Sequence, residues 1–224
     1  MLRRRVFTRS SVRRSILGST LVIVAAAVAV AASQLPALGA GGLLHPARHH
    51  VDVPAPDTCD DATFSGDGVH LQGWRCRAAG VRRATIVYLH GIADNRTSAA
   101  GVIQRFVPRG FDVVAYDSRA HGESDGDICT YGFFEKNDLH RVLDTVDDGP
   151  VVLLGTSLGA AVAILEAADD QRVATVVAAE TFADLRTVAT ERAPFFFTAA
   201  TIRKAALKET NVRQVSVSCM ISVE

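Results

Sequence analysis

The sequence predicts an α/β fold with a mostly parallel sheet covered by helices on both faces. From Cys59 onward, short segments rich in β-branched residues alternate with segments of helical periodicity. An antiparallel hairpin is expected ahead of them, because the dipeptide Asp67-Gly68 separates two strand-like segments and suits a two-residue type I′ turn. The apolar strand Val151 to Leu154 then continues directly into a helix through Gly155-Thr156-Ser157-Leu158-Gly159. These three features together predict the fold class.

Each expected element has a recognisable boundary. The strand Thr85 to Leu89 ends at His90-Gly91, and the helix Thr97 to Val107 is stopped by Pro108-Arg109-Gly110. The other expected elements are a strand over Phe111 to Tyr116, a helix over Phe133 to Val146, the strand Val151 to Leu154, a helix over Ser157 to Ala168 and a strand over Val173 to Ala179. Two helices at 185–190 and 195–208 and a weak strand at 212–221 are expected to follow.

The composition fits one globular domain and excludes a nucleic-acid-binding surface based on net charge. The chain has 224 residues, 48% of them hydrophobic and 21% charged. Its 24 basic and 24 acidic residues balance, so no overall field attracts nucleic acid. No nucleic-acid partner is expected.

The N-terminus has the pattern of an export signal. Arginines at positions 3, 4, 5, 9, 13 and 14 precede an uncharged segment over 16–32. Such a pattern indicates a signal peptide or an uncleaved membrane anchor over 1–33, and these two outcomes stay open. Residues 34–58 are rich in Pro and Gly and are expected to form a linker. Both outcomes place the main domain outside the cytoplasm, either secreted or anchored to the membrane.

Two of the four cysteines are expected to form a disulfide. If Gly66 faces Val69 across the hairpin turn, counting outward places Cys59 opposite Cys76, and cross-strand neighbours lie within bridging distance. The alternative is a pair of unpaired, half-buried thiols, as expected for a cytosolic domain.

Three motifs occur in an order that resembles the α/β-hydrolase superfamily. They are Tyr88-Leu89-His90-Gly91-Ile92 after a strand, the segment Tyr116-Asp117-Ser118-Arg119-Ala120-His121-Gly122-Glu123-Ser124, and the Gly-x-Ser-x-Gly elbow around Ser157. The second motif is similar to the Asp-x-Arg-Gly-His-Gly-x-Ser signature of the serine aminopeptidase and monoacylglycerol-lipase-like branch. Ala120 replaces the usual glycine there.

The resemblance implies roles for individual residues. Ser157 matches the nucleophile, and the backbone N–H groups of Leu158 and Ile92 match the oxyanion hole. Asp184 is a candidate acid, although an N-cap for the helix beginning near Leu185 explains it equally well. The implied substrate is a small ester or peptide. The implied chemistry forms an acyl-enzyme and requires no metal and no organic cofactor.

The base of a catalytic triad has no counterpart, because no histidine follows His140. We expect residues 59–208 to form a partial α/β-hydrolase domain that lacks its last strands, and 209–224 to be an unassigned tail. The chain is therefore expected to be C-terminally truncated and nearly inactive, and whether it is an enzyme as it stands is left open. The alternative is an exported, non-catalytic α/β-hydrolase-like domain that binds a partner or small ligand.

Overall fold

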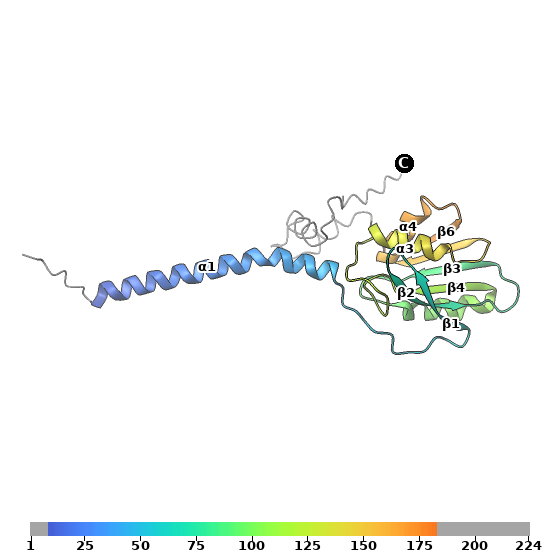
Figure 1. Cartoon of the computed structure of the whole chain (residues 1–224), viewed down its shortest axis with the longest axis horizontal. Helices are drawn as coiled ribbons and strands as arrows, with labels where there is room; N and C mark the ends of the chain where they lie inside the picture. The colour runs from blue at the N-terminus through green and yellow to red at the C-terminus, as the bar shows by residue number, and fades with distance from the viewer. Residues whose placement is uncertain (1–8, 183–224) are drawn as a thin grey trace, which may run out of the picture.

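A six-stranded mixed sheet with helices on both faces forms the domain (Figure 1). The computed structural model describes residues 9–182, so Asp184 and the elements expected at 185–190, 195–208 and 212–221 lie outside the described residues. The strands are β1 (Cys59–Ser65), β2 (His70–Cys76), β3 (Ala84–Leu89), β4 (Phe111–Tyr116), β5 (Val151–Thr156) and β6 (Val173–Ala179). The helices are α1 (Arg9–Leu44), α2 (Ala100–Phe106), α3 (Phe133–Leu143) and α4 (Leu158–Ala167), and 3₁₀ turns η1 (Arg96–Ala99) and η2 (Val107–Arg109) flank α2.

The topology confirms the predicted fold class. The strand order is β1-β2-β4-β3-β5-β6, in which β4, β3, β5 and β6 run parallel and the β1–β2 hairpin is antiparallel. Every residue of β3 is buried, as expected for a parallel strand covered on both faces.

The two faces of the sheet carry separate apolar cores. Helices α3 and α4 cover one face, where Leu139 and Val162 pack with Leu71, Val87 and Leu153. Helix α2 covers the other face (Figure 1), where Ile103 packs in a cluster with Trp74, Ile86 and Val113. The sheet is therefore a rigid platform from which the connecting loops project.

The hairpin has the expected register but a different turn. The Gly66 N–H donates to the Val69 carbonyl (2.8 Å), and Cys59 pairs with Cys76. Gly68 has a φ of +74°, whereas Asp67 lacks the positive φ that a type I′ turn requires. The type I′ prediction is wrong because the Asp67 N–H donates to Asp138 Oδ1 (2.7 Å), which ties the turn to α3.

The helices differ in length from the prediction. Helix α2 covers Ala100–Phe106 rather than Thr97 to Val107, because 3₁₀ turns replace its two ends. Helix α3 ends at Leu143 rather than Val146, because the Thr145 and Val146 N–H groups donate to carbonyls three residues earlier. Helix α1 continues past residue 33 to Leu44, through Pro- and Gly-containing sequence that we expected to be linker. Proline costs a helix one hydrogen bond but does not always end it.

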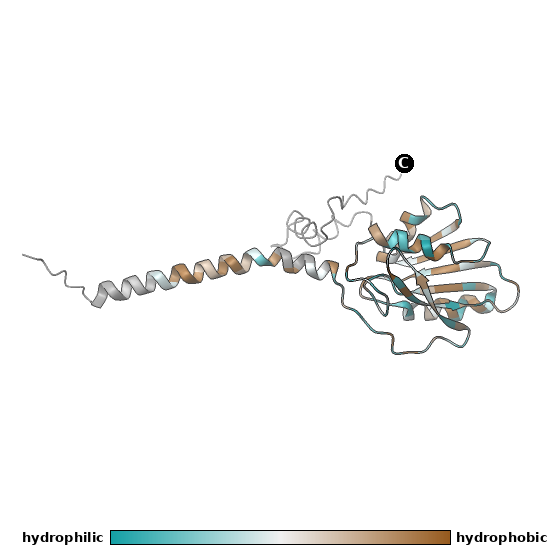
Figure 2. Ribbon diagram, viewed as in Figure 1, coloured by the Kyte–Doolittle hydropathy of each residue, from teal (hydrophilic) through white to brown (hydrophobic). Residues whose placement is uncertain are grey.

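Helix α1 contains an apolar stretch that projects away from the domain. Gly18–Leu35 is long and apolar enough to cross a membrane, and none of it is buried. Figure 2 shows this stretch as the brown part of α1. A signal sequence has the same properties, so the observation is compatible with both a cleaved signal and an anchor.

Cys59 and Cys76 lie at the open end of the hairpin, with their Cα atoms 3.9 Å apart and their sulfur atoms joined. Within residues 9–182, Cys129 is the free cysteine, and it is buried.

We predict that thiol titration of the oxidised, unfolded chain detects Cys129 and Cys219 only. Detection of four thiols would contradict the pairing. The double variant Cys59→Ser/Cys76→Ser should lose about 3 kcal/mol of unfolding free energy, as expected for a loop of this length.

Candidate active site

Ser157 sits in a strained turn between β5 and α4. Its φ of 50° and ψ of −113° lie outside the regions that residues other than glycine usually adopt. The Ser157 N–H donates to the Ala179 carbonyl at the end of β6 (2.9 Å), and the Ser157 carbonyl accepts from the Ala161 N–H (3.1 Å). These two hydrogen bonds fix the backbone on both sides of the serine. The turn therefore lies at the edge of the sheet where β5 and β6 end.

The two glycines of the motif are required by close backbone contacts. A Cβ on Gly155 would lie 2.5 Å from the Ala160 nitrogen, and a Cβ on Gly159 would overlap the Leu89 carbonyl oxygen. Any side chain at Gly159 would therefore push α4 away from β3. The sequence motif thus has a steric cause in this fold.

The loop after β3 lies directly against Ser157. A Cβ on Gly91 would be 3.5 Å from the Ser157 Cβ, an ordinary van der Waals contact. Ile92 follows Gly91 and is 38% exposed, and Leu158 begins α4 with its side chain buried in the core. The structure therefore places Ser157 and Leu158 next to the loop that contains Gly91.

His90 braces this loop and has no spare nitrogen. Its Nδ1–H donates to the Gly91 carbonyl (2.7 Å), and its Nε2 accepts from the Ser118 N–H (2.9 Å). The ring is fully buried and packs edge-on against His121, with centroids 5.1 Å apart. Burial lowers the pKa of His90 to about 4, so the ring is neutral at physiological pH.

Asp117 ties the loop after β4 to the loop after β3. Its buried carboxylate accepts from the Arg96 N–H (2.7 Å), the Arg96 guanidinium (2.5 Å) and the Glu123 N–H (2.9 Å). A Cβ on Gly122, which has a φ of +46°, would overlap the Asp117 carboxylate. We did not predict from the sequence that Arg96 is the partner of this carboxylate. The one relevant signal in the sequence is the Asp of the second motif.

Arg119 and Ala120 complete this second loop. The Arg119 guanidinium donates two hydrogen bonds to Asp138 (2.6 and 2.8 Å), and its carbonyl accepts from His121 Nδ1–H (2.8 Å). Ala120 adopts a φ of 61°, so it occupies the left-handed conformation that glycine usually takes. These residues position loops and do not contact the serine hydroxyl.

No base lies beside the nucleophile candidate in the described structure. All seven histidines fall within residues 9–182, and none of them forms a hydrogen bond with Ser157. His140 instead bonds to Glu166 (2.7 Å) on α4. The expected acid Asp184 lies outside the described residues, so its position relative to Ser157 is undetermined.

The arrangement of Ser157 on the β5–α4 turn agrees with comparisons to known proteins. A family model described as the alpha/beta hydrolase fold matches residues 84–214, more than half of the chain. The chain belongs to the α/β-hydrolase fold family.

Several family members are similar over part of their length. The uncharacterised protein YqkD of Bacillus subtilis is 35% identical over 88 residues, which cover 37% of this chain and 29% of YqkD. The quorum-quenching protein AidA of Acinetobacter baumannii is 30% identical, over 55% of this chain and 44% of AidA. The Pyrococcus furiosus esterase Pf2001 superposes with a TM-score of 0.61 and 27% identity, covering 68% of this chain and 64% of the esterase. This α/β-hydrolase chain spans at most about half the length of the curated relatives described here.

Among the described residues of this α/β-hydrolase, one cluster offers ligand atoms for a metal. Single ligand atoms of His140, Glu166 and Asp170 lie within 4.8 Å of one another. Arg172 already binds both carboxylate oxygens of Asp170, and His140 is bonded to Glu166. The cluster is therefore an ion-pair network at the far end of α4 from Ser157.

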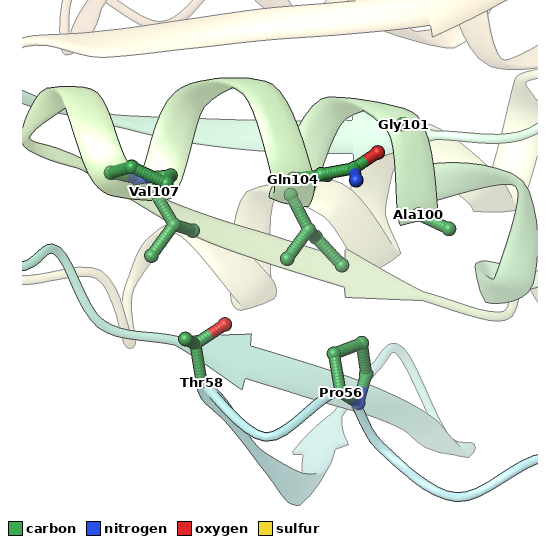
Figure 3. A pocket seen from close by; sticks show the side chains of 8 residues that line it. Pro56, Thr58, Ala100, Gly101, Gln104 and Val107 are labelled. Carbon is green, nitrogen blue, oxygen red and sulfur yellow. The ribbon is translucent and has the colours of Figure 1, made fainter.

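A surface hollow of about 450 Å³ lies on the α2 side of the molecule (Figure 3). It is lined by Pro56, Thr58, Ala100, Gly101, Ile103, Gln104, Val107 and Pro108. Because none of these residues is ionisable or belongs to the elbow, the hollow is not part of the Ser157 site.

The steric account of the elbow predicts different costs for two Gly-to-Ala changes in helices. Gly159→Ala should lower the unfolding free energy by about 2 kcal/mol, because the new methyl overlaps backbone atoms that cannot move independently. Gly101→Ala in α2, where no atom lies within 4 Å of the added Cβ, should be neutral or stabilising by up to about 1 kcal/mol. Urea unfolding measures both, and equal effects would contradict the account.

The depressed pKa of His90 predicts acid sensitivity. The unfolded chain binds a proton near pH 6.5 and the folded chain only near pH 4, so folding stability falls as the pH drops between these values, by about 3 kcal/mol. Unfolding free energies measured from pH 7 to pH 4 check this. His90→Gln should flatten the dependence, whereas His70→Gln, at an exposed position, should not.

If His90→Gln does not fold, an NMR titration of the unmodified chain decides the same question. The His90 ring should remain neutral at pH 5, and a protonated ring at that pH would contradict the account.

Proposed function

We propose that this chain carries the nucleophile of a serine hydrolase that acts on esters or short peptides through an acyl-enzyme. The single observation that supports this most is the strained backbone of Ser157 on a turn whose two glycines allow no side chain. Strain of this kind persists only where the surrounding structure enforces it, and it clusters at functional sites. The Pyrococcus furiosus protein Pf2001, which is 27% identical to this chain, is named as an esterase, and this supports the proposed chemistry.

The proposed reaction uses the backbone beside Ser157. The serine oxygen attacks the acyl carbon, the carbonyl oxygen becomes an oxyanion, and collapse of this intermediate breaks the bond to the leaving alcohol or amine. The N–H groups of Leu158 and Ile92 are proposed to stabilise the oxyanion, at about 3 kcal/mol each. Leu158 begins α4, so the helix dipole adds to this effect. Water then cleaves the acyl-serine ester. No metal or organic cofactor takes part in these steps.

Proton removal is the step that the described residues do not provide. A serine hydroxyl is a weak nucleophile unless a base accepts its proton, and no histidine contacts Ser157. We therefore propose that the 224-residue chain by itself is nearly inactive, with Asp184 as the candidate acid. Assignment to the serine aminopeptidase and monoacylglycerol-lipase-like branch is part of this proposal, supported by the Asp117 to Ser124 motif.

We further propose that α1 exports the domain and anchors it in a membrane. Gly18–Leu35 is apolar, none of it is buried in the domain, and an arginine cluster precedes it. A disulfide between Cys59 and Cys76 fits an oxidising compartment.

The absence of a base beside Ser157 favours one second candidate, a non-catalytic α/β-hydrolase-like domain that binds a small ligand or partner. The two candidates differ in the reactivity of Ser157, because a binding domain does not need a nucleophilic serine.

A fluorophosphonate ester tests the proposal directly. We expect slow, stoichiometric labelling of the chain that maps to Ser157 by peptide mass spectrometry and is lost in Ser157→Ala. Ser98→Ala is the matched control, because Ser98, in η1 after β3, also carries a hydroxyl but is bonded to Asp94. No labelling above that of Ser157→Ala would support the binding domain, and labelling as fast as in a complete serine esterase would contradict near-inactivity.

A further inference from the structure

The segment at and after the end of α1 is mostly exposed but is hydrogen-bonded to the domain. We call residues 44–51 the strap. The Leu44 carbonyl accepts from the Cys129 N–H (2.7 Å), and the His45 ring donates to the Asp127 carbonyl (2.7 Å). These linker residues are mostly exposed, but their hydrogen bonds hold them against a loop that has no regular structure.

Arg48 ties the strap to three carbonyl groups of this loop. Its guanidinium donates to the carbonyls of Ser124 (2.6 Å), Gly126 (2.8 Å) and Gly122 (3.4 Å). The next residues continue the attachment, since His50 and the Val51 N–H both bond to the Glu123 carboxylate (2.9 and 3.1 Å). The C-terminal end of α1 is thus fastened to the loop that follows β4.

This loop lies at the same edge of the sheet as Ser157. Strands β3, β4 and β5 are parallel, so their carboxyl ends meet at one edge. The strap grips the loop after β4, Ile92 follows β3, and Ser157 follows β5. Asn95, in the loop after β3, also donates to the His49 carbonyl (3.0 Å), which links the strap to the loop beside Ser157.

We propose that the strap holds the Ser157 edge of the domain toward the membrane that α1 spans, and that the substrate is an acyl ester of an amphiphile located at that bilayer surface. This proposal rests on the proposed function, both for the serine and for the anchor. It deepens that function by naming the source and the class of the substrate.

The length of α1 sets the distance between the bilayer and the site. The apolar stretch ends at Leu35 and the helix ends at Leu44. Nine helical residues rise about 14 Å, whereas the polar layer of one leaflet is about 5–8 Å thick. The strap therefore begins just outside the headgroup layer, which places the Ser157 edge next to the bilayer surface.

The surface of this edge fits contact without deep insertion. Ile92 (38% exposed) and Phe133 (46% exposed) present apolar side chains there, while Asp125 and Asp127 keep exposed carboxylates beside them. Val81 is 90% exposed at the opposite edge, so apolar exposure alone does not select a face. The strap determines which face of the domain meets the membrane, because the strap fixes which edge of the sheet lies next to α1.

Energy transfer to labelled lipid tests the orientation without requiring activity. The full chain with Cys219→Ser is reconstituted into phosphatidylcholine vesicles that carry an acceptor dye on headgroups, and a donor dye is attached at Asp127→Cys or at Asp148→Cys. Both positions are exposed, but Asp127 lies at the Ser157 edge and Asp148 lies before β5 at the opposite edge. Strands of six residues separate the edges by about 20 Å.

We expect transfer at least about twofold more efficient from position 127 than from position 148, given this separation. Arg48→Ala should reduce the difference, whereas His49→Ala should preserve it, because the His49 side chain makes no hydrogen bond to the described domain. Equal or reversed transfer would overturn the proposed orientation. Failure of the chain to float with vesicles would overturn the anchor and the orientation with it.

A second measurement tests the substrate class. Ser157 labelling by a long-chain alkyl phosphonate embedded in the vesicles is compared with labelling by a short, water-soluble phosphonate. We expect Arg48→Ala to lower the ratio of embedded to soluble labelling severalfold and His49→Ala to leave it unchanged. An unchanged ratio in Arg48→Ala would overturn the substrate class. If neither probe labels Ser157, the proposed hydrolase function fails and the substrate class with it, and energy transfer still decides the orientation.

Discussion

The contact between the start of α4 and the end of β3 is the constraint on which the rest of the site depends. Gly159 lies so close to the Leu89 carbonyl that no side chain fits between them. This contact sets where α4 begins, and the resulting short connection from β5 leaves Ser157 with a left-handed φ. The loop after β3 starts at the same point, so Gly91 comes into contact with Ser157. One close approach between a helix and a strand therefore assembles three parts of the candidate site.

The parts of the fold that depend on local pattern could be predicted from the sequence. The bounds of β4 and β6 follow from apolar segments between clear breaks, and the pairing of Cys59 with Cys76 follows from counting outward from one turn. The parts that depend on distant partners could not. The Asp67 backbone conformation is set by Asp138, which is 71 residues away in the chain. Likewise, nothing near Arg48 indicates that it binds three carbonyls of a loop more than 70 residues later.

Buried polar groups connect the two loops beside the nucleophile candidate. Asp117 is fully buried and receives its hydrogen bonds from Arg96 and Glu123, and His90 receives one from Ser118. The bonds from Arg96 and Ser118 join the loop after β3 to the loop after β4, and the bond from Glu123 lies within the loop after β4. Loss of one partner would leave a buried polar group unsatisfied, at a considerable cost in stability. The same second loop is held from outside by Arg48. Hydrogen bonds therefore run without a break from the end of α1 through the loop after β4 to the loop that contains Gly91.

The central claim is the proposal that Ser157 is the nucleophile of an acyl transfer and that the described residues supply no base for it. Chemical rescue by imidazole tests it most directly. The rate at which a p-nitrophenyl ester acylates the full chain is measured with and without added imidazole, and Ser157→Ala supplies the background. The account predicts very slow acylation that imidazole accelerates in the unmodified chain well beyond its effect on Ser157→Ala. Equal acceleration in both proteins, or rapid acylation without imidazole, would contradict it.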